Sequence, residues 1–134
     1  MSAYIVSNET INTIAWGFVT LGVDYYPKNS HHRPIRNVFV NDTIQKIGES
    51  LLQQNYDSVN HRYGETTPAP KEQFEKPKEF DLGKLYGCIH CYEYQACETE
   101  DYYNEEIHDS LVSLERAITQ KLLDNAGLET PWGV

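Results

Sequence analysis

Long apolar stretches are missing from this sequence, and so are the features of a secretory leader. No run approaches the roughly 20 apolar residues that a membrane-spanning helix needs. Residues 1–10 contain neither a basic nor an apolar segment, unlike a signal peptide. The three cysteines are an odd number, which does not suggest a disulfide framework. We therefore expect a cytoplasmic protein with free thiols and no membrane contact.

Common catalytic and nucleotide-binding motifs are absent as well. The sequence has no Gly-x-Ser-x-Gly, no Walker loop, no His-Glu-x-x-His and no Gly-x-Gly-x-x-Gly. Cys91 could be a nucleophile with His61 or His108 as its base. Almost any chain with three cysteines and five histidines allows such a pair, so this one is not specific. The sequence therefore identifies no catalytic residue and no cofactor. It favours a protein that is not an enzyme, without deciding the question.

Basic residues are missing from about a quarter of the chain. No Lys or Arg lies between Lys84 and Arg116, where there are eight acids, while the remainder has twelve acids and eleven bases. Nearly all of the net charge of −9 thus comes from residues 85–115. Such a surface repels nucleic acid, which is bound through clustered Lys and Arg, and attracts a basic surface of another protein. The alternative is a solvated acidic face that serves only solubility.

Tyrosines accompany these acids. Tyrosine is common at recognition surfaces because it combines a large rigid ring with a polar hydroxyl. Tyr92 falls on an apolar helix stripe and is expected in the core instead. The predicted partner-binding residues are Glu93, Tyr94, Glu98, Glu100, Asp101, Tyr102, Tyr103, Glu105, Glu106 and Asp109. Alternatively, Arg62 and Tyr63 could converge with Glu93 and Tyr94 in a pocket for a small molecule or nucleotide.

A metal site is considered and set aside. Cys88, His90 and Cys91 form a Cys-x-His-Cys segment, and Cys97 follows six residues later. A structural zinc site needs four well-spaced ligands, and the second distant pair is missing. Buried free thiols are therefore expected, with no metal.

The first long loop carries a small basic cluster. Its members are His31, His32, Arg33 and Arg36. Such a cluster is usually solvated. It could also bind an anion, or pair with the acidic residues of a second copy and so form a homodimer.

Apolar residues recur at helical spacing in four places. The expected helices are capped by Ser7, by Asn41 or Asp42, by Asp81 and by Asn104. The first should end near Gly22. The chain length of 134 residues fits one domain. We predict a single all-α domain over 1–134, a four-helix arrangement with long loops.

Some segments are less regular. Gly83 and Gly87 weaken the third helix, so a strand through 85–94 is the alternative. A short turn is expected at 58–63. Three prolines and charges of alternating sign predict a mobile surface loop over 65–79. The tail, which contains Pro131 and Trp132, is expected to dock back on the domain.

Two segments of the chain resemble a known group of proteins. The first contains Asn55, Ser58, Val59, Arg62, Tyr63 and Gly64; the second is Cys91-Tyr92-Glu93-Tyr94-Gln95-Ala96-Cys97-Glu98, with Pro131-Trp132-Gly133 at the end. Together they resemble small uncharacterised proteins of phages, prophages and plasmids. The resemblance implies no activity and no catalytic residues. It implies a bacterial host cytoplasm, in which small acidic phage proteins often block defence nucleases, sometimes by imitating DNA.

Three hypotheses follow. The favoured one is an acidic binding protein that inhibits a host nuclease or another nucleic-acid-binding protein through a basic surface of that partner. The second is a helical protein that binds a small molecule or nucleotide. The third is a component of a virion or of its assembly. A convex acidic face would favour the first, and a concave pocket with converging polar groups the second.

Overall fold

The computed structural model describes residues 6–27, 33–36, 39–63, 72–97 and 104–128, without the side chains of 61–63 and 96–97. Its helices are α1 (Asn8–Leu21), α2 (Val40–Tyr63), α3 (Leu82–Cys97) and α4 (Glu105–Ala126). The described ranges contain no strand, although Tyr25 and Ile35 form an isolated antiparallel bridge. The predicted all-α, four-helix arrangement is confirmed, and the alternative of a strand through 85–94 is wrong.

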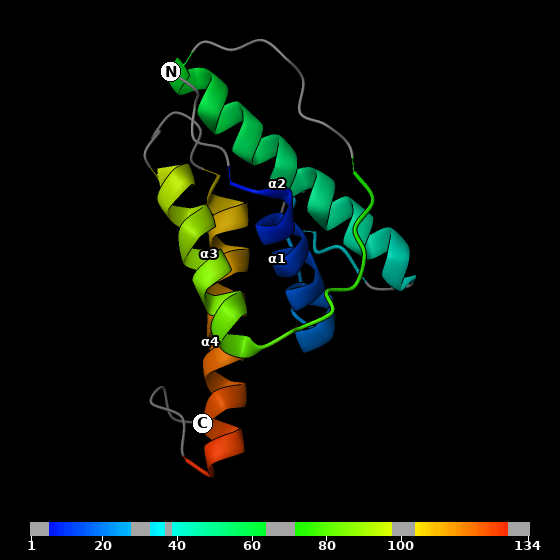
Figure 1. The fold of residues 1–134 in the computed structure, drawn as a ribbon, viewed down its shortest axis with the longest axis vertical. Helices are drawn as coiled ribbons and strands as arrows, with labels where there is room; N and C mark the ends of the chain where they lie inside the picture. Colours follow the sequence, from blue (N-terminus) through cyan, green and yellow to red (C-terminus); the bar gives the residue numbers. More distant parts are fainter. Residues whose placement is uncertain (1–5, 28–32, 37–38, 64–71, 98–103, 129–134) are drawn as a thin grey trace.

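The helices are arranged around α1 (Figure 1). α3 and α4 run side by side, and α1 lies between this pair and the long α2. α1 contacts each of the other three helices, whereas the described parts of α2 and α4 do not contact each other. The C-terminal part of α4 extends beyond the other helices. None of the described helices combines the length and the apolar character needed to cross a membrane.

Side chains cap the starts of three helices as predicted. Oγ of Ser7 accepts a hydrogen bond from the backbone N–H of Thr10 at 3.2 Å. Oδ1 of Asp81 accepts one from the backbone N–H of Lys84 at 2.7 Å. Oδ1 of Asn104 accepts one from the backbone N–H of Ile107 at 3.0 Å. The first helix ends at Gly22, whose φ of 66° is left-handed and suits glycine.

The boundaries of α2 differ from the prediction. The helix begins at Val40, and the N–H of Thr43 donates to the carbonyl of Phe39 at 3.0 Å, so Asn41 and Asp42 lie inside the first turn. The turn expected at 58–63 is wrong, because α2 continues to Tyr63. The hydroxyl of Ser58, which is buried, donates to the backbone carbonyl of Gln95 on α3 at 3.3 Å. This contact holds the last turns of α2 against α3.

The apolar stripes of the four helices meet in one core. Its fully buried members include Ile11, Ile14, Phe18, Ile44, Ile47, Leu51, Leu85, Ile89, Tyr92, Leu111, Leu114 and Ile118. Tyr92 is in the core as predicted, and its hydroxyl donates to the carbonyl of Leu51 at 3.1 Å. Leu122 continues the α4 stripe in sequence but is 49% exposed. The reason is that this part of α4 extends past the other helices.

A loop residue completes the core. Tyr25, four residues after the end of α1, is fully buried, and its ring meets that of Phe18 edge-on at 5.0 Å between centroids. Its hydroxyl donates to Oγ of Ser50 on α2 at 3.1 Å. Burial raises the pKa of Tyr25, so the side chain stays neutral. The loop between α1 and α2 is thereby attached to the helices.

Residues 72–81 cross the molecule as an extended segment between the α2 side and the start of α3 (Figure 1). Two side chains hold its backbone. Nε2 of Gln45 on α2 donates to the carbonyl of Glu72 at 2.7 Å, and Nδ2 of Asn12 on α1 donates to that of Glu75 at 2.8 Å. We refer to residues 72–81 as the strap.

The strap includes the second half of the loop expected over 65–79, and the mobility of that loop stays a prediction. Phe74 packs against the core, so the second half of that range is attached to the helices through both apolar and polar contacts. Residues 65–71 lie outside the described residues, as do Pro131 and Trp132 of the tail. Leu128, the last described residue, is 61% exposed.

Candidate functional site

Of the predicted acidic site residues that the structure describes, Glu93 lies in the second half of α3, and Glu105, Glu106 and Asp109 lie in the first turns of α4. Glu105 and Asp109 are exposed on the first turns of α4, and Glu106 between them is half-buried. Tyr94 on α3 has 69% of its surface exposed. The structure thus places Tyr94 on α3 and the three acids on α4, and their role in binding a partner stays a prediction.

For the other predicted site residues, the structure does not place the side chains. Glu98, Glu100, Asp101, Tyr102 and Tyr103 lie outside the described residues. The backbone of Arg62 and Tyr63 belongs to the end of α2, but their side chains lie outside the description. Their convergence with Glu93 and Tyr94 in a pocket therefore stays a prediction.

Glu93 belongs to a cluster of charged side chains between α3 and α4. One ligand atom from each of His90, Glu93 and Glu115 lies within 4.8 Å of the others. Nε2 of His90 is 3.7 Å from Oε1 of Glu115. His90 and Glu93 are three residues apart on α3 and so share a helix face, while Glu115 reaches the same place from α4. We call these three residues the His–Glu cluster.

The electrostatics of the His–Glu cluster are unfavourable for ionised carboxylates. Burial and the nearby charge of Glu115 raise the pKa of Glu93, and the two neighbouring histidines, His108 and His90, offset only part of this. Oε1 of Glu93 and Oε1 of Glu115 are both buried from water, and neither accepts a hydrogen bond within the described parts of the chain. Two carboxylates at close range repel each other unless a positive charge lies between them.

Two further side chains border the cluster. The ring of Tyr86, one turn before His90 on α3, meets the imidazole edge-on at 4.5 Å between centroids. His108 on α4 lies near Glu93, as its effect on the pKa of that carboxyl shows. Its Nδ1 is 3.7 Å from Oδ1 of Asp109. The cluster therefore adjoins the exposed acids at the start of α4.

Cys88 and Cys91 take no part in this cluster. Cys88 and Cys91 are free thiols as predicted, and both are half-buried, whereas buried thiols were expected. Burial is the main reason that the pKa of the Cys88 thiol is raised, which disfavours the reactive thiolate. Among the described residues, the group of side chains that could hold a metal ion contains His90 but neither Cys88 nor Cys91.

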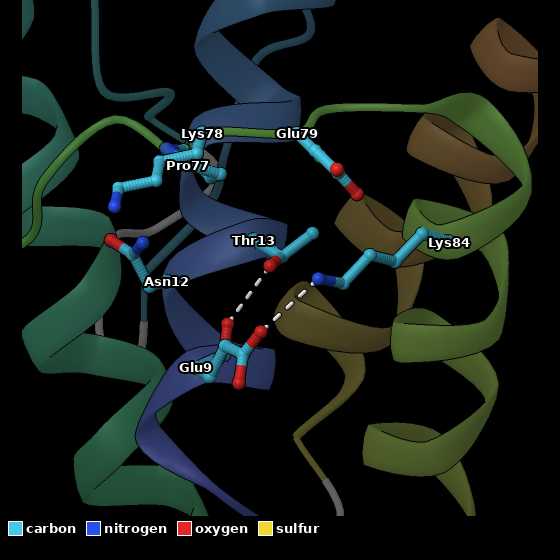
Figure 2. A pocket seen from close by; sticks show the side chains of 7 residues that line it. All are labelled: Glu9, Asn12, Thr13, Pro77, Lys78, Glu79 and Lys84. Carbon is cyan, nitrogen blue, oxygen red and sulfur yellow. Dashed lines mark hydrogen bonds and ion pairs between the residues drawn. The ribbon is translucent and has the colours of Figure 1, made fainter.

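A separate hollow of about 350 Å³ lies between α1, the strap and the start of α3 (Figure 2). Lys84 Nζ donates to Oε1 of Glu9 at 3.1 Å across it, and Glu79 extends towards Lys84. Asn12 and Thr13 on α1 complete its floor. The hollow is lined by different residues from the pocket that the sequence suggested, and two of its charged side chains, Glu9 and Lys84, pair with each other.

The basic cluster of the first loop is described in part. His31 and His32 lie outside the described residues, and Arg33 is exposed. Arg36 donates from one nitrogen to both carboxylate oxygens of Asp24, at 3.0 and 3.1 Å. This pair connects the two ends of the loop, so Arg36 has a structural partner.

Comparison with known proteins adds no assignment. The chain matches no protein-family model, no curated protein sequence and no solved structure.

Proposed function

We propose that the protein acts by binding a basic surface of another protein through Tyr94 of α3 and the exposed acids Glu105 and Asp109 of α4. We call these residues the acidic face. The proposal rests on the exposure of Tyr94, the residue that follows Glu93 in the sequence. Tyr94 has a large aromatic side chain, and 69% of its surface is exposed to solvent. An exposed ring of this size gains free energy when a partner covers it, and tyrosine is frequent at interfaces for that reason.

The charges at the start of α4 support the proposal. Glu105 and Asp109 are one helical turn apart and exposed, a like-charge spacing that costs a few tenths of a kcal/mol in an isolated helix. No Lys or Arg occurs in residues 85–115 to balance them. A basic partner would relieve this repulsion and would also be attracted from a distance, because complementary charges accelerate association.

The chemistry of the face suggests the class of partner. Closely spaced anions resemble the phosphates of a nucleic acid, so a protein with a basic nucleic-acid-binding groove is the partner we propose. A host defence nuclease inhibited by a protein from a phage or another mobile element would fit, and it agrees with the resemblance noted in the sequence. No catalytic step belongs to this proposal.

The test compares two variants of equal charge change. Glu105→Lys/Asp109→Lys reverses two exposed acids of the acidic face, and Glu75→Lys/Glu79→Lys reverses two exposed acids of the strap. Each variant and the wild type are immobilised and exposed to a bacterial lysate. Retained proteins are identified by mass spectrometry and then purified for competition with duplex DNA.

We expect a nucleic-acid-binding protein to be retained by the wild type and by the strap variant, and to be lost by the α4 variant. DNA should displace it. Equal retention by all three chains, or a retained partner that DNA does not displace, would contradict the proposal.

A further inference from the structure

We propose that His90, Glu93 and Glu115 form a binding site for a divalent transition-metal ion of the zinc class. Their ligand atoms lie within 4.8 Å of one another. In a tetrahedral site with metal–ligand bonds of about 2.1 Å, ligand atoms stand about 3.4 Å apart. Side-chain rotations that move each ligand atom by roughly 1 Å would therefore close the set around an ion.

The backbone beneath each ligand is held by the core. His90 follows Ile89, and Glu93 follows Tyr92; both preceding side chains are buried to 1% exposure or less. Glu115 follows Leu114, which is fully buried. The three ligands thus stand on rigid positions of two packed helices, the arrangement that gives metal sites their precision. Helical bundles build carboxylate and histidine metal sites from facing helices in this way.

The buried carboxylate oxygens are poorly compensated, because Nε2 of His90, at 3.7 Å from Oε1 of Glu115, is too far away for a hydrogen bond. The buried Oε1 atoms of Glu93 and Glu115 accept no hydrogen bond within the described ranges, and close carboxylates are costly when both are ionised. The exposed side of His90, with 53% of its side chain open to solvent, leaves a path by which an ion can enter. A cation at this place would bind both buried oxygens.

The ligand types select the class of ion. Imidazole nitrogen suits zinc, iron, nickel and copper, whereas Mg²⁺ and Ca²⁺ take oxygen ligands almost exclusively. Three protein ligands leave a fourth position for water, which distinguishes the site from a closed structural zinc site. The inference does not depend on the acidic face binding a partner.

The experiment is a calorimetric titration of the full chain with ZnCl₂, and separately with MgCl₂. Glu93→Gln and Glu115→Gln each remove one proposed ligand oxygen while keeping the size of the side chain. Glu105→Gln makes the same change at an exposed position of α4. Cys88→Ser/Cys91→Ser/Cys97→Ser removes the thiols, which are the competing zinc ligands. Circular dichroism confirms that each variant is folded.

We expect one Zn²⁺ per chain, with affinity reduced at least about tenfold in Glu93→Gln and in Glu115→Gln. Affinity for Zn²⁺ should be unchanged in Glu105→Gln and in the thiol variant, and the separate titration with MgCl₂ should show no binding at this site. Absence of Zn²⁺ binding, equal affinity in all the Gln variants, or loss of binding on removal of the thiols would overturn the proposal. Because two independent ligand variants are measured, misfolding of one does not remove the test.

Discussion

The ring of Phe74 on the strap fills the space next to Gly48 on α2, where the Cβ atom of any other residue would overlap with it. This contact, with the hydrogen bonds of Gln45 and Asn12 to the strap backbone, attaches the strap to α1 and α2. Gly48→Ala should therefore displace Phe74 and destabilise the protein by about 1–3 kcal/mol, the usual cost of overpacking. Chemical denaturation measures the loss, and amide hydrogen exchange should quicken in the strap.

A matched control exists on α3. Gly87 is also inside a helix, and a Cβ atom built there meets nothing within 4 Å. Gly87→Ala should stabilise the protein by roughly 0.5–1 kcal/mol, because alanine is the better helix former. If both substitutions act in the same direction, the packing of Phe74 against α2 is not what holds the strap.

Glu93→Gln should raise the melting temperature of the metal-free protein at neutral pH. Burial and the nearby charge of Glu115 raise the pKa of Glu93, so the ionised carboxyl costs free energy in the folded state, and the substitution removes that cost. The control is Glu105→Gln, which removes an exposed charge at the start of α4, where the helix dipole favours an anion. That variant should melt at the wild-type temperature or slightly below it. A lower melting temperature for Glu93→Gln would mean that the ionised carboxylate stabilises the fold.

Ser110→Ala should destabilise the protein by about 1–3 kcal/mol, the cost of leaving a buried polar group without its partner. Ser110 is fully buried on α4, and its hydroxyl accepts a hydrogen bond from the N–H of Tyr26 at 2.9 Å. Ser113 on the same helix is exposed, so Ser113→Ala should change stability by less than about 0.5 kcal/mol. Urea denaturation of both variants gives the comparison, and equal effects would show that the bond to Tyr26 is unimportant.

Tyr94→Ala should weaken partner binding without changing the melting temperature. With 69% of its surface exposed, the side chain contributes little to the core, whereas a buried interface tyrosine commonly contributes more than about 1 kcal/mol. The effect should appear as faster dissociation. Unchanged dissociation would remove Tyr94 from the interface.

Local chemistry made much of the fold predictable. The caps at Ser7, Asp81 and Asn104 were identified because a short polar side chain before an apolar stripe has few other roles. The start of α2 was placed too late because Asn41 and Asp42 suit a cap and a first helical turn equally well. Its end was placed too early because Ser58 is held by a distant residue of α3, which no local pattern reveals.

The His–Glu cluster shows where sequence reasoning ended. The spacing of His90 and Glu93 puts them on one face of a helix and was visible in the sequence. The third member, Glu115, depends on how α3 and α4 align along each other, and core packing decides that alignment. In the sequence, the Cys-x-His-Cys segment with Cys88 and Cys91 resembles a zinc motif more than the spacing of His90 and Glu93 does. In the structure, those two cysteines lie outside the cluster.

The association rate with the captured partner tests the binding proposal most directly. It is measured at two salt concentrations for the wild type, for Glu105→Lys/Asp109→Lys and for Glu75→Lys/Glu79→Lys. We expect the α4 variant to associate much more slowly than the other two chains at low salt. The difference should shrink at high salt, because exposed charges are screened beyond about 10 Å at 0.1 M. Equal rates for the two charge-reversed variants at both salt concentrations would contradict the account and leave the acidic face as a solvated surface.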